Sequence, residues 1–79
     1  PEIHDVQIRG EEIRVKTSPV QVINFIARNG LGRRFFASDK PINKATYGMR
    51  GNEGYIRVEA EDYKGRTAWT NPIIIRKED

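Results

Sequence analysis

The chain has 79 residues, of which 37% are hydrophobic and 32% charged, with a formal net charge of +3 and no cysteine. This length fits one small domain with little room for a deep catalytic cleft, and the composition is that of ordinary soluble globular protein, neither disordered nor membrane-spanning. The absence of cysteine excludes disulfides, thiolate chemistry and zinc–cysteine sites, and it leaves the redox compartment open.

No targeting segment is visible in the sequence. No apolar run approaches the ~20 residues that a transmembrane helix requires, and no charged-then-apolar leader precedes the first apolar stretch. Nothing in the sequence therefore directs secretion, and we expect a cytoplasmic domain with no membrane partner.

The net charge of +3 raises the question of nucleic-acid binding. A phosphate-binding surface needs clustered charge of one sign, because its affinity grows with the number of phosphates neutralised. Here the charges are mixed, as at Arg57 beside Glu59 and Glu61, and only Arg33–Arg34 with nearby Arg28 forms a basic group. We expect charged strand edges that keep a β protein soluble, and no nucleic-acid partner.

The N-terminal part of the chain predicts two strands. Ile3–Ile8 alternates between apolar and polar residues, and the broken step between Ile3 and Val6 indicates a β-bulge. A turn at 10–11 leads to a second strand over Glu12–Thr17. We expect that strand to end at Ser18–Pro19, because proline cannot donate a hydrogen bond to the ladder.

Val20–Ala27 is the longest apolar run, and its phase is ambiguous. Val20 and Val22 fall on one face of a strand, whereas Ile23 and Phe25 fall on the other. Either both faces of this strand are covered, or the strand kinks near Val22.

The segment Asn29-Gly30-Leu31-Gly32 predicts a hairpin. The Asn-Gly pair favours the positive φ angles of a type I′ turn. A strand over Arg33–Ala37 should therefore return beside Ile23–Ala27, and residues 39–41 should form a loop after it.

The C-terminal half predicts three or more further strands. Alternation over 45–49 indicates the first of them, before a glycine-rich turn. Tyr55–Glu61 is the most regular, with one buried and one wet face. A turn at Tyr63–Gly65 joins it to a strand that begins near Arg66, and Ile73–Ile75 supplies the last.

These elements together predict the fold class. They are about seven short strands at intervals of about 8–12 residues, with turn residues between them and no helical period. We expect an all-β, immunoglobulin-like antiparallel β-sandwich that occupies residues 1–79 as a single domain, with a small barrel as the alternative.

The hairpin near the C-terminus carries residues with clear structural tasks. Asp62 can accept hydrogen bonds from backbone amides at the start of the turn, and Gly65 can adopt the positive φ that a short reversal needs. Pro72 removes a ladder donor, so the strand either starts afresh after it or crosses to the other sheet, and the Asn71 side chain can satisfy a backbone group left open there. The full structural motif comprises Asp62, Gly65, Arg66, Trp69, Asn71 and Pro72.

No constellation for catalysis or metal binding is visible. His4 is the only histidine and lacks a second ligand or an orienting partner. Glu59 and Glu61 form an exposed charge ladder with their basic neighbour, and Gly30-x-Gly32 has no helix after it to bind a phosphate. We expect no catalytic, cofactor-binding or metal-binding residue and no enzymatic activity in this chain.

The aromatic residues suggest both a core and an interface. Phe25, Trp69 and one of the two adjacent phenylalanines are the expected large core side chains. Since adjacent strand residues point to opposite faces, the other phenylalanine should lie outside the core, as should the tyrosines on the wet face and at the turn. The possible interface residues are Phe35, Phe36, Tyr55, Arg57 and Tyr63.

Three segments carry a resemblance to a known family. Tyr-Ile-Arg-Val-Glu-x-x-Asp-x-x-Gly-Arg-x-Ala-Trp-Thr-Asn-Pro-Ile, at Tyr55 to Ile73, resembles the closing stretch of proteins in the PHP (polymerase and histidinol phosphatase) superfamily of metal-dependent phosphoesterases, especially its CehA/McbA-like branch. Gly10 to Val20 is similar to the strand and Ser-Pro turn that open the C-terminal region of that family. Ala45 to Tyr55 resembles the strand before its final hairpin.

The resemblance implies a β-sandwich that follows a catalytic barrel, in which divalent metals are held by His and Asp/Glu ligands. None of those ligands can be carried over to this chain, so the metals are expected in the parent catalytic domain alone. The chain is then expected to be an accessory domain from the C-terminus of a larger protein, with the catalytic domain of that protein as its partner. The sequence gives no oligomeric state. The alternative is an independent fibronectin-like or immunoglobulin-like binding module for carbohydrate or protein.

Overall fold

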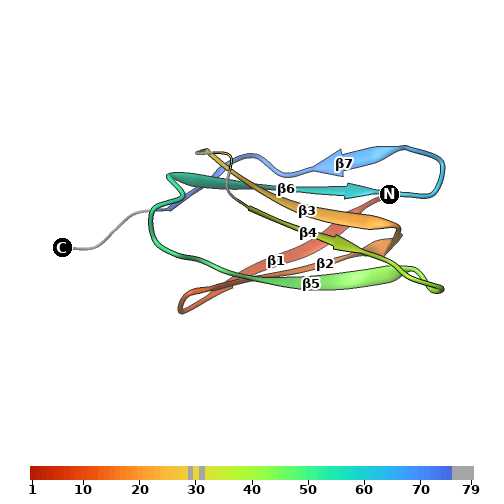
Figure 1. Cartoon of the computed structure of the whole chain (residues 1–79), viewed down its shortest axis with the longest axis horizontal. Helices are drawn as coiled ribbons and strands as arrows, with labels where there is room; N and C mark the ends of the chain where they lie inside the picture. Colours follow the sequence, from red (N-terminus) through yellow and green to blue (C-terminus); the bar gives the residue numbers. More distant parts are fainter. Residues whose placement is uncertain (29, 31, 76–79) are drawn as a thin grey trace.

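The computed structural model describes residues 1–28, 30 and 32–75, and these residues form eight strands and no helix (Figure 1). The strands are β1 (Ile3–Arg9), β2 (Glu12–Val20), β3 (Val22–Ala27), β4 (Gly32–Phe36), β5 (Ile42–Gly48), β6 (Tyr55–Glu61), β7 (Thr67–Trp69) and β8 (Ile73–Ile74). All pairings are antiparallel. The smaller sheet has the order β1-β2-β5, and the larger one has the order β4-β3-β6-β7 with β8 also paired to β6. The expected immunoglobulin-like β-sandwich is therefore confirmed.

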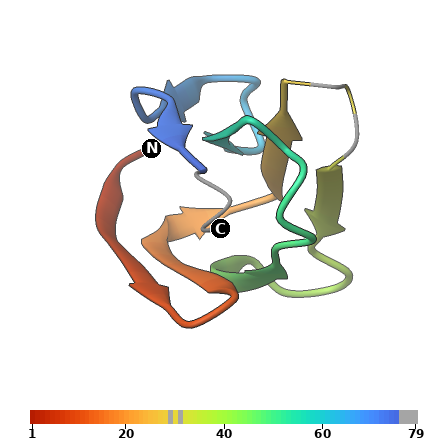
Figure 2. The ribbon, with the colours of Figure 1, turned by 90° about the vertical axis from the view of Figure 1, so that its left-hand side faces the viewer.

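The core lies between the two sheets, which Figure 2 shows nearly end-on. Alternate residues of β2, β3 and β6 point inward, as the period-two pattern requires. The rings of Phe25 on β3 and Tyr47 on β5 stack across the sandwich with their centroids 5.3 Å apart. Burial of each large apolar side chain contributes about 1.5–3 kcal/mol, so this small core is what holds the sheets together. Its apolar members with the least exposure are Ile13, Val15, Val20, Ile23, Phe25, Ile56, Val58 and Ala60.

The ambiguous apolar run is resolved by a corner between the two sheets. The chain bends at Gln21, where β2 of the smaller sheet ends and β3 of the larger sheet begins. The Gln21 amide donates to the Glu61 carbonyl (2.9 Å), and the Gln21 carbonyl accepts from the Ala37 amide (2.7 Å). Val20 and Val22 are both buried on either side of the bend. The alternative of a kink near Val22 is confirmed.

The expectation that the second strand ends at Ser18–Pro19 is wrong, because β2 continues to Val20. Lys16 pairs with Lys44 and Val20 with Ile42, so three residues of β2 oppose a single residue of β5. Pro19 lies in this bulge, where the ladder does not need its missing donor. The bulge expected in the first strand is confirmed, since the register of β1 against β2 shifts between Ile3 and Asp5.

The hairpin β3–β4 is confirmed by its register, in which Ile23 pairs with Phe35 and Ile26 with Gly32. Asn29 of the expected type I′ turn lies outside the described residues, and Gly30 has a φ of 82°. Gly32 permits an unusually close approach of the two strands, because a Cβ on it would lie 1.9 Å from the carbonyl oxygen of Phe25. The hairpin therefore requires glycine at this position.

The last strand is interrupted at Pro72 and resumes in the same sheet. Both β7 and β8 pair with β6, β7 near its end and β8 near its start. Of the two alternatives, the fresh start after Pro72 is confirmed. The group left open by the break is the Val58 amide, and it donates to Oγ1 of Thr70 (3.1 Å). The expectation that Asn71 would satisfy it is wrong, because Asn71 is exposed and Thr70 is the residue that faces β6.

Candidate functional site

The outer face of the larger sheet carries a row of chemically different side chains. The strand registers place Arg34, Asn24, Glu59 and Trp69 directly opposite one another on four successive strands. Since directly opposed residues share a face of the sheet, all four point away from the core. Arg34 donates from Nε to Oδ1 of Asn24 (2.8 Å), which fixes the first half of the row.

Three large apolar side chains protrude from the same face. Phe36, Trp69 and Ile74 are 62%, 64% and 63% exposed. Phe36 pairs with Val22, and Ile74 pairs with Tyr55. The side chains of Phe36 and Ile74 both point to the outer side of the larger sheet. We call this surface the aromatic face and define it by Arg34, Phe36, Arg57, Glu59, Trp69 and Ile74.

The expectation that Trp69 belongs to the core is wrong. Trp69 opposes Glu59, whereas its neighbour Ala68 opposes the fully buried Ala60 and takes the inward position. The strand β7 has only three residues, so it offers a single inward position, and a small side chain fills it. The tryptophan is thereby left in solvent.

The charges of the aromatic face are mixed and partly paired. Arg57 lies 3.5 Å from Glu59, measured from Nη2 to Oε1, and its guanidinium is half-exposed. The guanidinium carbon of Arg34 lies 5.6 Å from the ring centroid of Phe36, within the range of a cation–π contact. Of the exposed ladder expected for Glu59 and Glu61 beside Arg57, the structure shows the pair of Arg57 with Glu59, and both glutamates are half-buried rather than exposed. Beside this pair lies a shallow hollow of about 240 Å³, whose lining includes Asn24, Ile26, Gly30, Gly32, Arg34 and Glu59.

The structure separates the five possible interface residues. Phe36 points outward, and Phe35 points inward, where its ring meets that of Phe25 edge-to-face at 5.9 Å. The expectation that one of the two phenylalanines lies outside the core is confirmed. Tyr55 and Arg57 are half-buried on the outer side of β6. Tyr63 is exposed at the turn after β6, beyond the end of the aromatic face.

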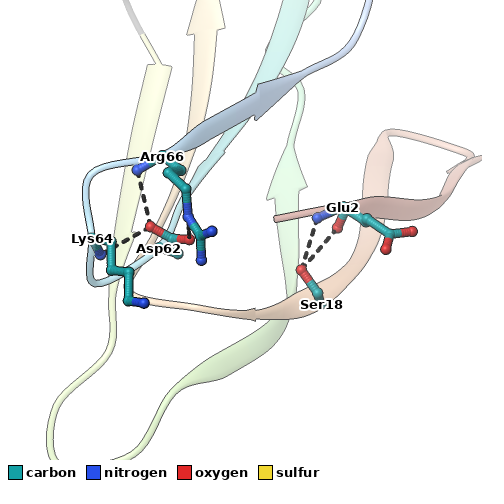
Figure 3. A network of polar contacts seen from close by, with 5 residues as sticks. All are labelled: Glu2, Ser18, Asp62, Lys64 and Arg66. Atoms are coloured by element: carbon teal, nitrogen blue, oxygen red, sulfur yellow. Dashed lines mark hydrogen bonds and ion pairs between the residues drawn. The ribbon is translucent and has the colours of Figure 1, made fainter.

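The turn that joins β6 to β7 is organised by Asp62, as Figure 3 shows. Oδ1 of Asp62 accepts from the amides of Lys64 and Arg66 (both 2.9 Å), and Oδ2 accepts from Nε of Arg66 (2.7 Å). Burial raises the pKa of Asp62, but the hydrogen bonds from Arg66 and Lys64 hold it below its usual value. Gly65 has a φ of 79°, which the reversal requires. Both expectations for this turn are confirmed.

The same close-up shows a second small network at the start of the chain (Figure 3). The amide of Glu2 donates to Oγ of Ser18 (2.8 Å), and the Ser18 amide donates to the Glu2 carbonyl (2.9 Å). These bonds extend the pairing of the N-terminal segment with β2 past the bulge. The network is structural.

One buried ionisable residue, Glu53, lies in the loop between β5 and β6 and is not among the residues expected from the sequence. Only 1% of the surface of Glu53 is accessible to solvent. Its carboxylate accepts from Oη of Tyr47 (2.6 Å) and from the amides of Arg50 (2.7 Å) and Gly51 (2.8 Å). The only sequence signal was a glutamate within a glycine-rich turn, Gly51-Asn-Glu-Gly54, where loop backbone can wrap around a carboxylate.

The environment of this pair shifts both pKa values. Burial raises the pKa of Glu53, but its hydrogen bonds from Tyr47, Arg50 and Gly51 outweigh burial and lower the pKa overall. Burial, the hydrogen bond to Glu53 and the negative charge of that residue raise the pKa of Tyr47 to about 12. Glu53 is therefore an ionised structural anchor, with its oxygens already engaged by donors of the loop.

The described residues contain no cluster of three or more His, Asp or Glu side chains that could hold a metal ion. They also include no helix with the length and apolarity that crossing a membrane demands. Comparison of the sequence with protein-family models and with curated proteins, and of the fold with solved structures, gives no match.

Proposed function

We propose that this chain is a non-catalytic accessory domain that packs, through its aromatic face, against the catalytic domain of the same protein. The observation that carries the proposal is the exposure of Phe36, Trp69 and Ile74 on one face of one sheet. The sequence resemblance at Tyr55 to Ile73 supplies the kind of partner, a PHP-type metal-dependent phosphoesterase. In such a protein the divalent metals belong to the catalytic domain.

The energetics of the aromatic face suit a protein partner. A tryptophan carries roughly 150–250 Å² of surface, so covering the exposed part of Trp69 would contribute about 3 kcal/mol at ~25 cal/mol per Å². Tryptophan and arginine are the residues most often found at the energetic centres of interfaces. The paired charges around Trp69 would form the polar rim that surrounds such a centre.

The first test is the coding sequence that precedes Pro1. The proposal requires a reading frame that continues upstream into a domain with His-x-His and further His and Asp ligands. A start codon immediately before Pro1 would overturn it.

The second test uses the full-length protein and its Trp69→Ala and Ile8→Ala variants. Ile8 is a control because it is also exposed but lies on β1, in the other sheet. We expect Trp69→Ala to lower the melting temperature or the turnover of the catalytic domain, and Ile8→Ala to change neither. Equal behaviour of the two variants would reject packing through the aromatic face.

A second candidate function is an independent binding module for carbohydrate or protein. The hollow beside Arg34 and Asn24 favours this function. The planar side-chain groups of these two residues lie on the same face of the sheet as the exposed ring of Trp69. Titration of the isolated chain with soluble oligosaccharides, followed by amide NMR shifts, distinguishes the two functions. Saturable shifts along the aromatic face would support the module, and their absence would leave the accessory domain.

A further inference from the structure

A second hollow, of about 310 Å³, lies on the smaller sheet, away from the aromatic face. It is lined by His4 of β1, Lys16 and Thr17 of β2, and Asn43 and Lys44 of β5. All three strands of the smaller sheet therefore contribute to it. Apart from Thr17, these residues are exposed at the surface.

Two register shifts meet at this hollow. The register of β1 against β2 shifts beside His4, between Ile3 and Asp5. The register of β2 against β5 shifts immediately after the pair Lys16 and Lys44. Bulges bend a strand locally and re-aim its side chains, and here they leave an opening bordered by basic groups.

The placement of the two lysines is electrostatically unfavourable without a ligand. Lys16 and Lys44 are directly opposed on neighbouring strands, and like charges in this position repel. Asp5 opposes Lys16 on the other side, yet neither lysine makes an ion pair with any described residue. By contrast Arg14, one pleat further along β2, is paired with Glu12 at 2.9 Å.

His4 adds a third nitrogen group to the hollow. Its Nε2 lies 3.8 Å from a carboxylate oxygen of Glu2, a loose contact with a side chain that is 80% exposed. The side-chain amide of Asn43 offers a further donor. Glu2 contacts His4 and Asp5 opposes Lys16, but no described ion pair joins either carboxylate to the ammonium group of Lys16 or Lys44.

We propose that this hollow binds a phosphate group, either as free phosphate or as part of a small phosphoester. A phosphate carries up to two negative charges and several acceptor oxygens, and lysine binds it as a point charge. The ammonium groups of Lys16 and Lys44 would then both bind one anion. The attraction of each lysine to the anion would offset the repulsion between the two lysines. The site involves none of the residues of the aromatic face.

The proposal is tested on the isolated chain by amide NMR titration with sodium phosphate at constant ionic strength, with chloride as the exchanged anion. We expect saturable shifts centred on Lys16, Thr17, Asn43 and Lys44. Lys44→Gln should weaken binding about tenfold, the loss expected for one charged contact. Arg9→Gln removes the same charge from the other end of the smaller sheet and should leave binding unchanged.

Phenyl phosphate and sulfate complete the experiment. Tighter binding of phenyl phosphate than of inorganic phosphate would support a phosphoester ligand, and equal binding would support the free anion. Sulfate that binds as tightly as phosphate would show a site for charge alone and would overturn the proposal as a phosphate site. Linear shifts without saturation, or equal weakening by Lys44→Gln and Arg9→Gln, would overturn it as a site of any kind.

Discussion

Glu53 is the residue whose burial most needs a physical explanation. A carboxylate at 1% exposure is stable in its charged form only where hydrogen bonds replace the lost water. Tyr47 and the amides of Arg50 and Gly51 provide those bonds. Because Tyr47 lies on β5 and also stacks on Phe25, the same contacts fix the β5–β6 loop against the core.

Tyr47→Phe should therefore destabilise the domain, although it removes a single oxygen. A hydrogen bond to a charged group contributes about 1.5–3 kcal/mol, and we expect a loss of that size in urea unfolding. Tyr63→Phe is the matched control, because Tyr63 is exposed and its change should stay within about 0.5 kcal/mol. Equal effects of the two variants would show that the Tyr47–Glu53 bond contributes nothing.

The same pair predicts how stability depends on pH. The pKa of Glu53 is lower in the folded state than in the unfolded state, so its contribution is present above the unfolded value and is lost as the pH falls through the folded value. The pKa of Tyr47 is raised to about 12, so its contribution is full below its unfolded value and is lost as the pH rises toward 12. The stability difference between wild type and Glu53→Gln should therefore be constant near neutral pH and shrink in acid. A difference that grows in acid would contradict the direction of the shift.

Phe35 and Phe36 offer a second test at single-residue scale. Phe35 packs against Phe25, and Phe36 is 62% exposed. We expect Phe35→Ala to cost about 2–3 kcal/mol, less than a fully buried phenylalanine, and Phe36→Ala to cost under about 1 kcal/mol. Equal losses in chemical denaturation would mean that the aromatic face is packed within the isolated domain.

Some buried and exposed positions could be predicted from the sequence, and others could not. Alternation correctly placed Ile56, Val58 and Ala60 inward, because a regular strand carries its own phase. Trp69 was misplaced, because β7 is too short to display a phase and takes it from its pairing with Glu59. Glu53 was missed, because its burial depends on donors that only the folded loop brings together.

At the scale of the elements, the hairpin β3–β4 depends on one glycine. A Cβ at position 32 would meet the carbonyl oxygen of Phe25 at 1.9 Å, so Gly32→Ala must push the strands apart. We expect a loss of about 2–3 kcal/mol in thermal or urea unfolding, in the range of overpacked sites. Gly48→Ala in β5 is the control, because its Cβ would meet nothing within 4 Å, and it should be neutral or slightly stabilising. Comparable losses in both variants would contradict the close approach.

The opposed lysines of β2 and β5 predict a stabilising substitution. Lys44→Glu would place opposite charges across from one another, a change in pairing that contributes about 0.2–1 kcal/mol. We expect stability to rise by about this amount at low salt and the gain to shrink at high salt. Lys40→Glu in the preceding loop makes the same change in net charge and should give no comparable gain. A gain common to both variants would reflect net charge alone.

Features that depend on pairing between distant strands could not be predicted from the sequence. Turn residues and apolar alternation located all eight strands and the β3–β4 hairpin, because these are properties of adjacent residues. The opposition of Lys16 and Lys44 and the row from Arg34 to Trp69 depend on register between strands far apart in the chain. The corner at Gln21 appeared in the sequence only as a change in the alternation of apolar residues along Val20–Ala27. The alternation within one segment cannot show that its two ends belong to different sheets.

For the whole molecule, the two proposed surfaces lie on the outer sides of different sheets. The sheets of a sandwich pack about 10 Å apart, and exposed charges separated by more than about 8 Å are largely screened at physiological salt. The phosphate site and the aromatic face share no residue and no described hydrogen bond. They should therefore act independently.

A double-mutant comparison in the full-length protein tests this independence. Trp69→Ala should leave the phosphate-induced NMR shifts unchanged. The change in melting temperature caused by Trp69→Ala should be the same with and without Lys44→Gln. The effects of the two substitutions on stability should then add to within about 0.5 kcal/mol. Because the rigid core of the sandwich separates the two surfaces, coupling between them would require the sheets to shift against each other. A measured coupling above about 1 kcal/mol would contradict the independence of the two faces and would point to a partner that spans both sheets.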